Sequence, residues 1–302
     1  MNHAPDLLFP HLGIVIQTMK NDIMIGNFRI AYYGMIIGAG FILAMLLVEH
    51  IAKERGYDPD LYWDFFVYII IFGIIGSRAY YVACEWDYYS AHSEKILSTR
   101  EGGLAIYGGI IAVVVALFVF CRIKKQNPLA MLDTLIPGLL LGQIMGRWGN
   151  FFNCEAFGGY TDNLFAMRIR KAIVNPSMID EDLLMHLVTA EGTEYIQVHP
   201  TFLYESAWNF CTLLFILWYG KKKRKADGEC FFLYMIFYGV GRYLIEGLRT
   251  DSLYIPGTGI RISQAVSIFG IVVGAAAFVF VRKRFQKQKA TATEEKTQDI
   301  VS

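Results

Sequence analysis

Long apolar stretches dominate the chain, and three of them carry no charged residue: residues 30–48, 102–121 and 262–281. Each is about as long as a helix that crosses the hydrocarbon core of a bilayer, where every backbone polar group must be paired within the segment. Four further stretches are apolar but interrupted by isolated charges, and they cover about residues 63–83, 129–148, 200–220 and 230–247. The pattern predicts an all-α polytopic membrane protein with about seven transmembrane helices.

Basic residues gather after every second predicted span, which orients the chain. They follow the first, third, fifth and seventh spans, at Lys53 and Arg55, at Arg122, Lys124 and Lys125, at 221–225, and at 282–289. Because short cytoplasmic loops of membrane proteins are rich in Lys and Arg, these four ends are predicted to be cytoplasmic. The N-terminus and the loops after the even-numbered spans are then expected outside.

The polar segments outside the spans complete the predicted organisation. The segment over about 155–198 is polar enough to form a small extracytoplasmic cap. We expect residues 1–285, cap included, to form a single membrane-embedded domain. The tail over 286–302 is polar and is predicted to be disordered and cytoplasmic. The location implied is a cell membrane crossed several times, with the N-terminus outside and the C-terminus in the cytoplasm.

The composition argues against nucleic-acid binding, a metal site and a disulfide framework. The 302 residues are 55% hydrophobic and carry a net charge of +1, so no general attraction to nucleic acid is expected. The five cysteines are scattered without a CxxC motif or a Cys/His cluster, so neither a metal site nor a disulfide framework is indicated.

Charged residues inside the predicted spans are the first candidates for chemistry, because charge in a membrane is costly and usually faces a protein interior or a watery cavity. In the predicted topology five of them lie toward the outer face: Arg78, Arg147, Glu205, Arg242 and Glu246. Asp64 and Asp133 lie at inner ends, where structural ion pairs are the preferred interpretation. For Arg78, a structural and a functional role are both open.

The spacing of the outer charges along the sequence indicates a site for an anion. Arg242, Glu246 and Arg249 are spaced as i, i+4 and i+7, which places them on one stripe of a continuing helix. Two arginines, Arg147 and Arg242, facing an outer cavity would form a phosphate clamp, since guanidinium donors match phosphate oxygens in pairs. An outer-leaflet phospholipid is therefore the substrate class that the residues themselves suggest.

Paired glycines flank a short segment at the start of the third predicted span. Gly102-Gly103 and Gly108-Gly109 lie on either side of Leu104 to Tyr107. Glycine pairs allow either unwinding beside a cavity or close packing between helices, and both interpretations stay open.

The run Gly-Arg-Trp-Gly-Asn-Phe-Phe-Asn-Cys-Glu-Ala-Phe-Gly over 146–158 resembles the signature of bacterial prolipoprotein diacylglyceryl transferases. That signature reads roughly G-R-x-G-N-F-x-N-x-E-x-x-G. Further similar segments follow in the family's order: Tyr32-Tyr33-Gly34, the glycine-rich 102–109, 199–205 starting at His199, 241–249 and Ser263-Gln264. The resemblance covers about residues 13–285.

The resemblance implies transfer of the diacylglyceryl group of phosphatidylglycerol to the lipobox cysteine of a prolipoprotein, with release of glycerol-1-phosphate and without a metal or other cofactor. The partners implied are phosphatidylglycerol and a prolipoprotein signal peptide. The catalytic residues it implies are Arg147, Arg242, Tyr107 and Glu246. The substrate-binding residues it implies are Arg147, Tyr33, Asn150, Asn153, Glu155, Gly158, Gly102, Gly108, His199 and Arg249.

One position departs from the family pattern. Many members have a histidine, proposed to activate the thiol, where this chain has Tyr107. A tyrosine hydroxyl ordinarily titrates near about pH 10, so it is a weak base at neutral pH. The general base is therefore an open question between Tyr107 and Glu246, with arginine-assisted ionisation of the thiol as a third possibility.

Three other classes of membrane protein compete with the transferase. An outer-leaflet phospholipid transporter or flippase also uses intramembrane charge, but transporters usually place their sites near the midplane and contain internal repeats, which we do not find. A receptor or scaffold would use the charges as structural ion pairs. An intramembrane protease would need paired aspartates, or a Ser/His pair, at a common depth.

Overall fold

The computed structural model describes residues 4–26, 28–99, 102–255 and 257–301. Each of the seven predicted stretches corresponds to one long helix. These helices are α1 (Tyr32–Glu54), α2 (Pro59–Cys84), α4 (Ile106–Ile123), α5 (Pro128–Phe152), α7 (Thr201–Lys222), α8 (Glu229–Glu246) and α9 (Ile262–Val301). Shorter helical segments are α3 (Trp86–Ala91), α6 (Glu181–Met185), η1 (Ser93–Lys95), η2 (Lys171–Ile173) and η3 (Pro176–Met178).

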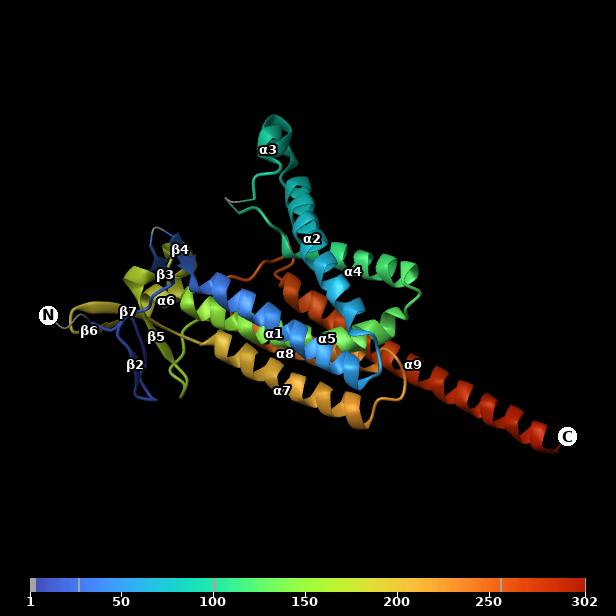
Figure 1. Cartoon of the computed structure of the whole chain (residues 1–302). Coiled ribbons are helices and arrows are strands. Elements are labelled where there is room, and N and C mark those ends of the chain that lie inside the picture. The colour runs from blue at the N-terminus through green and yellow to red at the C-terminus, as the bar shows by residue number, and fades with distance from the viewer. Residues whose placement is uncertain (1–3, 27, 100–101, 256, 302) are drawn as a thin grey trace. The chain divides into compact units, whose positions relative to one another are not determined.

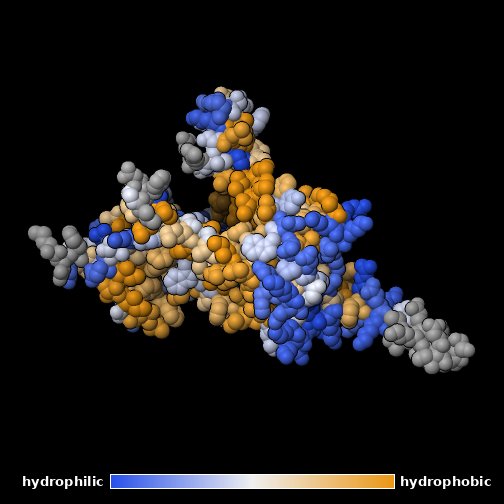
Figure 2. Space-filling view, viewed as in Figure 1, coloured by the Kyte–Doolittle hydropathy of each residue, from blue (hydrophilic) through white to orange (hydrophobic). Residues whose placement is uncertain are grey.

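Five of the long helices are long and apolar enough to cross a membrane: α1, α2, α4, α5 and residues Ile262–Thr291 of α9. Helices α7 and α8 fall outside that group. Both carry buried charge, with Glu205 in α7 and Glu246 in α8. The chain is thus a mostly helical, polytopic membrane protein. Figure 2 shows apolar side chains over the helices that face the viewer, with hydrophilic side chains gathered over the C-terminal end of α7.

The expected all-α fold needs one correction, because the protein also contains a five-stranded antiparallel sheet. Its order is β2 (Ile14–Ile16), β1 (Leu7–Phe9), β5 (Met167–Arg170), β7 (Thr193–Val198) and β6 (Val188–Ala190). A separate hairpin joins β3 (Asp22–Ile25) to β4 (Phe28–Ala31). Strands of three to six residues are too short for a clear alternating pattern, and β1 pairs with a strand far along the chain.

The sheet has a core of its own, built from both the N-terminal segment and the segment predicted as a cap. Leu7 of β1, Ile169 of β5, and Ile196 and Val198 of β7 are fully buried. The carboxylate of Asp6 accepts from the backbone N–H of Met19 at 2.8 Å. Residues 6–9 and 14–19 are therefore an integral part of this sheet.

The helices and the sheet fall into two compact units: residues 1–44 with 136–302, and residues 45–135. In the first unit, α8 packs against both α7 and α9. Figure 1 shows the strands of this unit gathered at one end of α7, near the N-terminus. In the second unit, α2 packs against α4. The tail predicted over 286–302 continues α9 to Val301, Ser302 lies outside the described residues, and the disorder of this tail stays a prediction.

Small residues bring α2 and α4 together. A side chain at Gly76 would overlap Ala112 and the backbone oxygen of Gly108, and one at Gly108 would overlap Tyr80. Close helix packing is therefore one role of the glycine at 108.

Candidate active site

A buried carboxylate collects three arginines in the first unit. Glu205, in the second turn of α7, is 4% exposed. Its Oε2 lies 2.9 Å from Nη2 of Arg147 on α5. Its Oε1 lies 3.4 Å from Nη1 of Arg242 and 3.6 Å from Nη1 of Arg249. Two parts of the chain that are far apart in the sequence, α5 and the end of α8 with its following loop, thus deliver guanidinium groups to one carboxylate.

Two more carboxylates balance this cluster. Glu246, one turn after Arg242 on α8, is 1% exposed, and its Oε2 lies 2.5 Å from Arg242 Nη2. Asp251 accepts two hydrogen bonds from Arg249, at 2.8 and 2.7 Å, in the paired geometry that suits a carboxylate. Three guanidinium groups therefore meet three carboxylates. Removing one partner of such a buried group leaves the other charges uncompensated, at a cost of about 3–5 kcal/mol.

The arginines differ in how open they are. The side chain of Arg147 is 22% exposed, against 17% for Arg242 and 11% for Arg249. Only one guanidinium nitrogen of Arg147 contacts Glu205, while Nη1 donates to Oδ1 of Asn150 at 3.3 Å. Of the three, Arg147 is the one best placed to meet an incoming anion.

The end of α5 folds back on itself to present Glu155. Asn150 and Asn153 each donate a side-chain N–H to Glu155 Oε1, at 2.9 and 3.3 Å. Cys154 and Ala156, on either side, have φ values of +50° and +56°, in a region that side-chain-bearing residues rarely occupy. Such backbone strain is typical of functional sites, where the surrounding contacts hold it in place.

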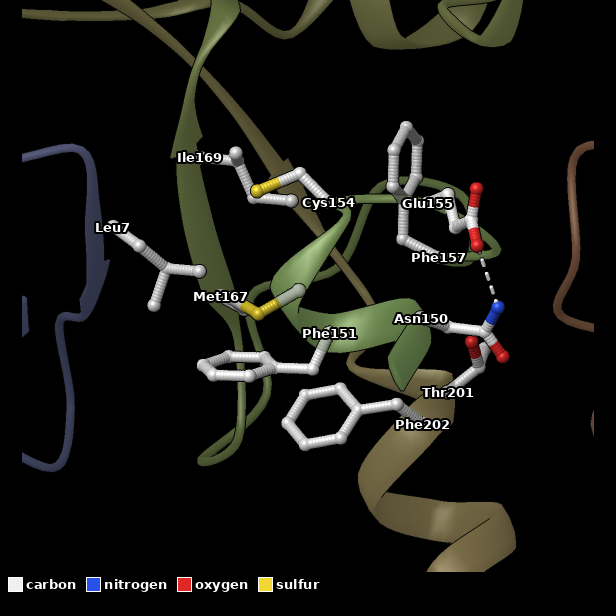
Figure 3. A pocket seen from close by; sticks show the side chains of 10 residues that line it. All are labelled: Leu7, Asn150, Phe151, Cys154, Glu155, Phe157, Met167, Ile169, Thr201 and Phe202. Carbon is white, nitrogen blue, oxygen red and sulfur yellow. Dashed lines mark hydrogen bonds between the residues drawn. The ribbon is translucent and has the colours of Figure 1, made fainter. Parts of the chain in front are cut away.

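Figure 3 shows the pocket beneath this turn, with the hydrogen bond from Asn150 to Glu155 on one side. Phe151 of α5 and Phe202 of α7 lie against each other, with ring centroids 4.6 Å apart. Cys154 points toward Ile169 of β5. The turn that carries Glu155 is therefore anchored in the core of the sheet.

Burial raises the pKa of Cys154 to about 11. Because the thiolate is the nucleophilic form of cysteine, this thiol is unreactive near neutral pH. Cys154 is therefore a packing residue of this turn rather than the reacting thiol.

Gly158 ties the sheet to the arginine-bearing loop after α8. Its N–H donates to the backbone oxygen of His199 at 2.9 Å, and it forms an isolated bridge with Arg249. A Cβ at this position would lie 2.7 Å from the oxygen of Leu248 and 2.8 Å from the Cβ of His199. Only glycine fits between these two segments.

His199 and Tyr33 lie at the edges of this arrangement. Burial lowers the pKa of His199, and Asn163 Nδ2 lies 3.4 Å from its Nδ1, which fits a neutral ring accepting at that nitrogen. The ring of Tyr33, 38% exposed, covers Gly149 of α5, where a Cβ would lie 2.7 Å from ring carbon Cδ2.

The remaining sequence candidates belong to the second unit. Gly102 lies in the loop before α4, Tyr107 is the second residue of that helix, and Gly108 packs against α2. Tyr107 is 39% exposed. Their part in the site stays a prediction, whereas the candidates of the first unit converge around Glu205, Glu155 and Gly158.

Three participants were absent from the sequence-derived site. Glu205 was noted as a membrane charge but not as a site residue, although it ends the segment that begins at His199. Asp251 was missed because it lies outside the helical stripe. Arg261 was also missed: its guanidinium donates to the backbone oxygen of Glu246, the last residue of α8, and spacing along one helix cannot suggest this contact.

A model of the prolipoprotein diacylglyceryl transferase family matches residues 21–280. The phosphatidylglycerol–prolipoprotein diacylglyceryl transferase of Lysinibacillus sphaericus is 40% identical over 269 residues, covering 89% of this chain and 94% of that protein. The proteins of the same name from Bacillus cytotoxicus and Clostridium botulinum (strain Loch Maree) are 38% and 40% identical, and cover 90% and 88% of this chain and 95% and 96% of their own lengths. On these matches, and with its charged cluster of three arginines, the chain belongs to the prolipoprotein diacylglyceryl transferase family.

Proposed function

We propose that the protein is a membrane transferase that moves the diacylglyceryl group of phosphatidylglycerol onto the lipobox cysteine of a prolipoprotein. The names of its relatives supply both substrates. The observation that carries the proposal is the convergence of Arg147, Arg242 and Arg249 on Glu205. The transporter alternative has no observation in its favour.

The proposed reaction is a single displacement. The cysteine thiol loses its proton to the acceptor, and its sulfur attacks the carbon of the diacylglyceryl group that is bonded to the phosphate oxygen. A C–S bond forms, the C–O bond to the phosphate breaks, and the electron pair leaves with glycerol-1-phosphate. Arg147 would hold the phosphate, and Arg242 would stabilise the charge that develops on the leaving oxygen, since guanidinium groups aimed at developing charge lower the barrier.

The supporting residues follow from their contacts. Asn150, Asn153 and Glu155 form the hydrogen-bonded turn next to Arg147, where they would orient the headgroup. Gly158 and His199 would hold the loop of Arg249 in place, and Tyr33 would line the approach over Gly149. Gly102, Tyr107 and Gly108 are assigned to the site on the family resemblance alone.

Two residues compete for the role of proton acceptor. Tyr107 occupies the position where many relatives have histidine. Glu246 is a buried carboxylate whose Oε2 lies 2.5 Å from Nη2 of Arg242. This contact occupies the oxygen, so the carboxylate serves to hold Arg242 in place. We therefore favour Tyr107 as the proton acceptor.

We also propose that all seven long helices span the membrane within a single domain over 1–285, with the N-terminus and the sheet outside and the C-terminus in the cytoplasm of a bacterial cell. Helices α7 and α8 can cross despite their charges because those charges are paired with one another inside the protein. The basic residues that follow α1, α4, α7 and the apolar part of α9 support this orientation.

The activity is tested with the purified protein in liposomes that contain phosphatidylglycerol and a synthetic lipobox peptide. Mass spectrometry should detect a peptide heavier by one diacylglyceryl group, and a peptide with serine in place of the cysteine should stay unmodified. Arg147→Lys and Arg242→Lys keep the charge but lose the planar fork, so turnover should fall by about 100-fold or more. Near-normal turnover in both variants would refute the phosphate clamp.

A further inference from the structure

Arg78 is a buried arginine of α2 that the proposed transfer does not use. It is 7% exposed. Its Nε donates to the backbone oxygen of Ile96 at 2.7 Å, and Nη2 donates to that of Lys95 at 2.7 Å. Its Nη1 donates to the oxygens of Gly103 at 2.9 Å and Gly102 at 3.2 Å. One side chain thus joins both ends of the loop that leads from η1 to α4.

Two aromatic rings complete the surroundings of this guanidinium. Its Cζ lies 5.1 Å from the ring centroid of Tyr89 and 6.0 Å from that of Tyr81. Every partner named here is neutral, and the ring faces attract the buried cation. Four of its five N–H donors bond to backbone oxygens of this loop, so the guanidinium is occupied in holding the loop rather than in binding a phosphate.

Gly103 has the backbone shape that this contact requires. Its φ is +75°, which a side-chain-bearing residue rarely adopts, and a Cβ there would overlap Arg78 Nη1 and lie 3.0 Å from Cε1 of Tyr81. The first glycine pair of the sequence therefore includes a position where backbone must approach an arginine.

The held loop leads into the first turn of α4, which carries Tyr107. The N–H of Ala105 donates to the backbone oxygen of Ser77, the neighbour of Arg78, at 3.0 Å. Helix α4 begins at Ile106, so Tyr107 lies in its first turn, and Gly108 packs against α2. The residues on both sides of Tyr107 are thus fixed to the same stretch of α2.

We propose that Arg78 is a positioning residue of the transferase, which sets the place of Tyr107 by holding the two ends of the loop, residues 95–96 and 102–103, against α2. The proposal rests on the proposed function and adds to it a residue that acts through another. Lysine cannot replace this arginine, because one ammonium group cannot reach carbonyls that lie on two sides of a planar fork.

The loop itself is tested by limited proteolysis of the full-length protein in detergent. Arg78→Lys should make the chain more sensitive to trypsin cleavage after Lys95, as followed by mass spectrometry. Gly103→Ala should raise the same cleavage although residue 78 is still an arginine, because the added methyl group displaces its guanidinium. The matched control is Arg55→Lys in the same unit, where Arg55 Nη1 donates to the Thr134 hydroxyl at 3.0 Å, away from this loop. Equal cleavage of wild type and both loop variants would overturn the proposal.

Catalysis is tested with the same variants in the lipobox-peptide assay. A misplaced reacting group should lower kcat by about 100-fold, with KM for phosphatidylglycerol nearly unchanged because the arginine clamp is untouched. In a double-mutant cycle, Arg78→Lys should cost much less in a Tyr107→Phe background than in wild type, since residues that act through one another are not additive.

The outcomes separate this proposal from the proposed function. Faster cleavage with unchanged kcat, or losses that add in full with Tyr107→Phe, would overturn the positioning role. If the wild-type protein modifies no peptide while Arg78→Lys still opens the loop, the proposed function fails instead, and the positioning role fails with it because it has no reaction to serve.

Discussion

Glu205 shows how a single residue can organise a site made of like charges. Three guanidinium groups would repel one another without the buried carboxylate between them, so Glu205 sets both their separation and their direction. A substrate phosphate could then replace part of this carboxylate's role at Arg147, the most open of the three. The pairing therefore preorganises the donors before the lipid arrives.

Replacing Glu205 with glutamine keeps the shape of the side chain and removes its charge. We expect Glu205→Gln to lower kcat/KM for phosphatidylglycerol by at least about tenfold, because the arginines lose the charge that holds them together. The control is Glu194→Gln, which breaks the exposed pair with Lys171 in the same unit and should leave activity unchanged. Wild-type turnover by Glu205→Gln would show that the cluster organises itself without this charge.

The identity of the proton acceptor is also decided at the scale of single residues. If Glu246 takes the thiol proton, Glu246→Gln should lose most activity and Tyr107→Phe should keep it. If the Tyr107 hydroxyl orients the lipid or accepts the proton, the order is reversed, and Tyr107→His should retain activity because histidine titrates near about pH 6.5. We expect the second pattern, because the positioning role proposed for Arg78 requires a reacting group at position 107, and pH–rate profiles of the three variants are the measurement.

At the scale of the elements, the contact between α2 and α4 depends on the absence of side chains. Gly76→Ala would place a methyl group against Ala112 and against the backbone of Gly108, and backbone cannot move aside as a flexible side chain can. The melting temperature of the detergent-solubilised protein should fall by several degrees, as overpacking of about 1–3 kcal/mol predicts. The control is Gly38→Ala on α1, where the added methyl group has no neighbour within 4 Å, and it should leave the melting temperature unchanged. Equal melting temperatures for the two variants would mean that these helices are not closely packed.

The junction between β7 and α7 should respond to pH through His199. Because burial lowers its pKa below the ordinary value of 6.5, the unfolded chain binds the proton more readily than the folded one. Stability from the neutral ring is therefore present above about pH 6.5 and is lost as the pH falls below it. Hydrogen exchange of β7 amides, corrected for intrinsic rates, should speed up at pH 5.5.

The matched variants isolate this effect. His199→Gln should remove the extra exchange at low pH, while a glutamine at the exposed His186 should retain it. An identical pH response in wild type and His199→Gln would assign the loosening to other groups of the sheet.

For the molecule as a whole, the proposed topology is tested by labelling in intact cells. Cysteines are introduced singly at Lys223, Lys283 and Asn163 in a background without the native cysteines, two of which, Cys84 and Cys211, are exposed. An impermeant thiol reagent should label the cysteine at 163 and leave those at 223 and 283 unlabelled until the cells are permeabilised. Equal labelling at all three positions would reject seven spans with the N-terminus outside.

The sequence alone located the start of each of the seven long helices to within a few residues, because apolar runs of this length have few other uses and because charge is rare inside them. Helices α1 and α9 continue past the predicted ends, to Glu54 and Val301. The sequence also supplied the family, since the run over 146–158 is specific. Spacing along one helix placed Arg242 one turn before Glu246, and their ion pair followed.

What only the tertiary structure decided involves contacts between distant segments. In the sheet, β1 pairs with β5, although more than half the chain separates them in sequence. A strand of three residues is too short for a periodic pattern that would predict this pairing. In the sequence, Glu205 is one membrane charge among several. The fold shows that Arg147 of α5, Arg242 of α8 and Arg249 of the loop after α8 surround it. Arg78 had two open interpretations, and four backbone oxygens of one loop settled its contacts. A sequence records which groups are costly to bury, whereas folding determines which partners make their burial possible.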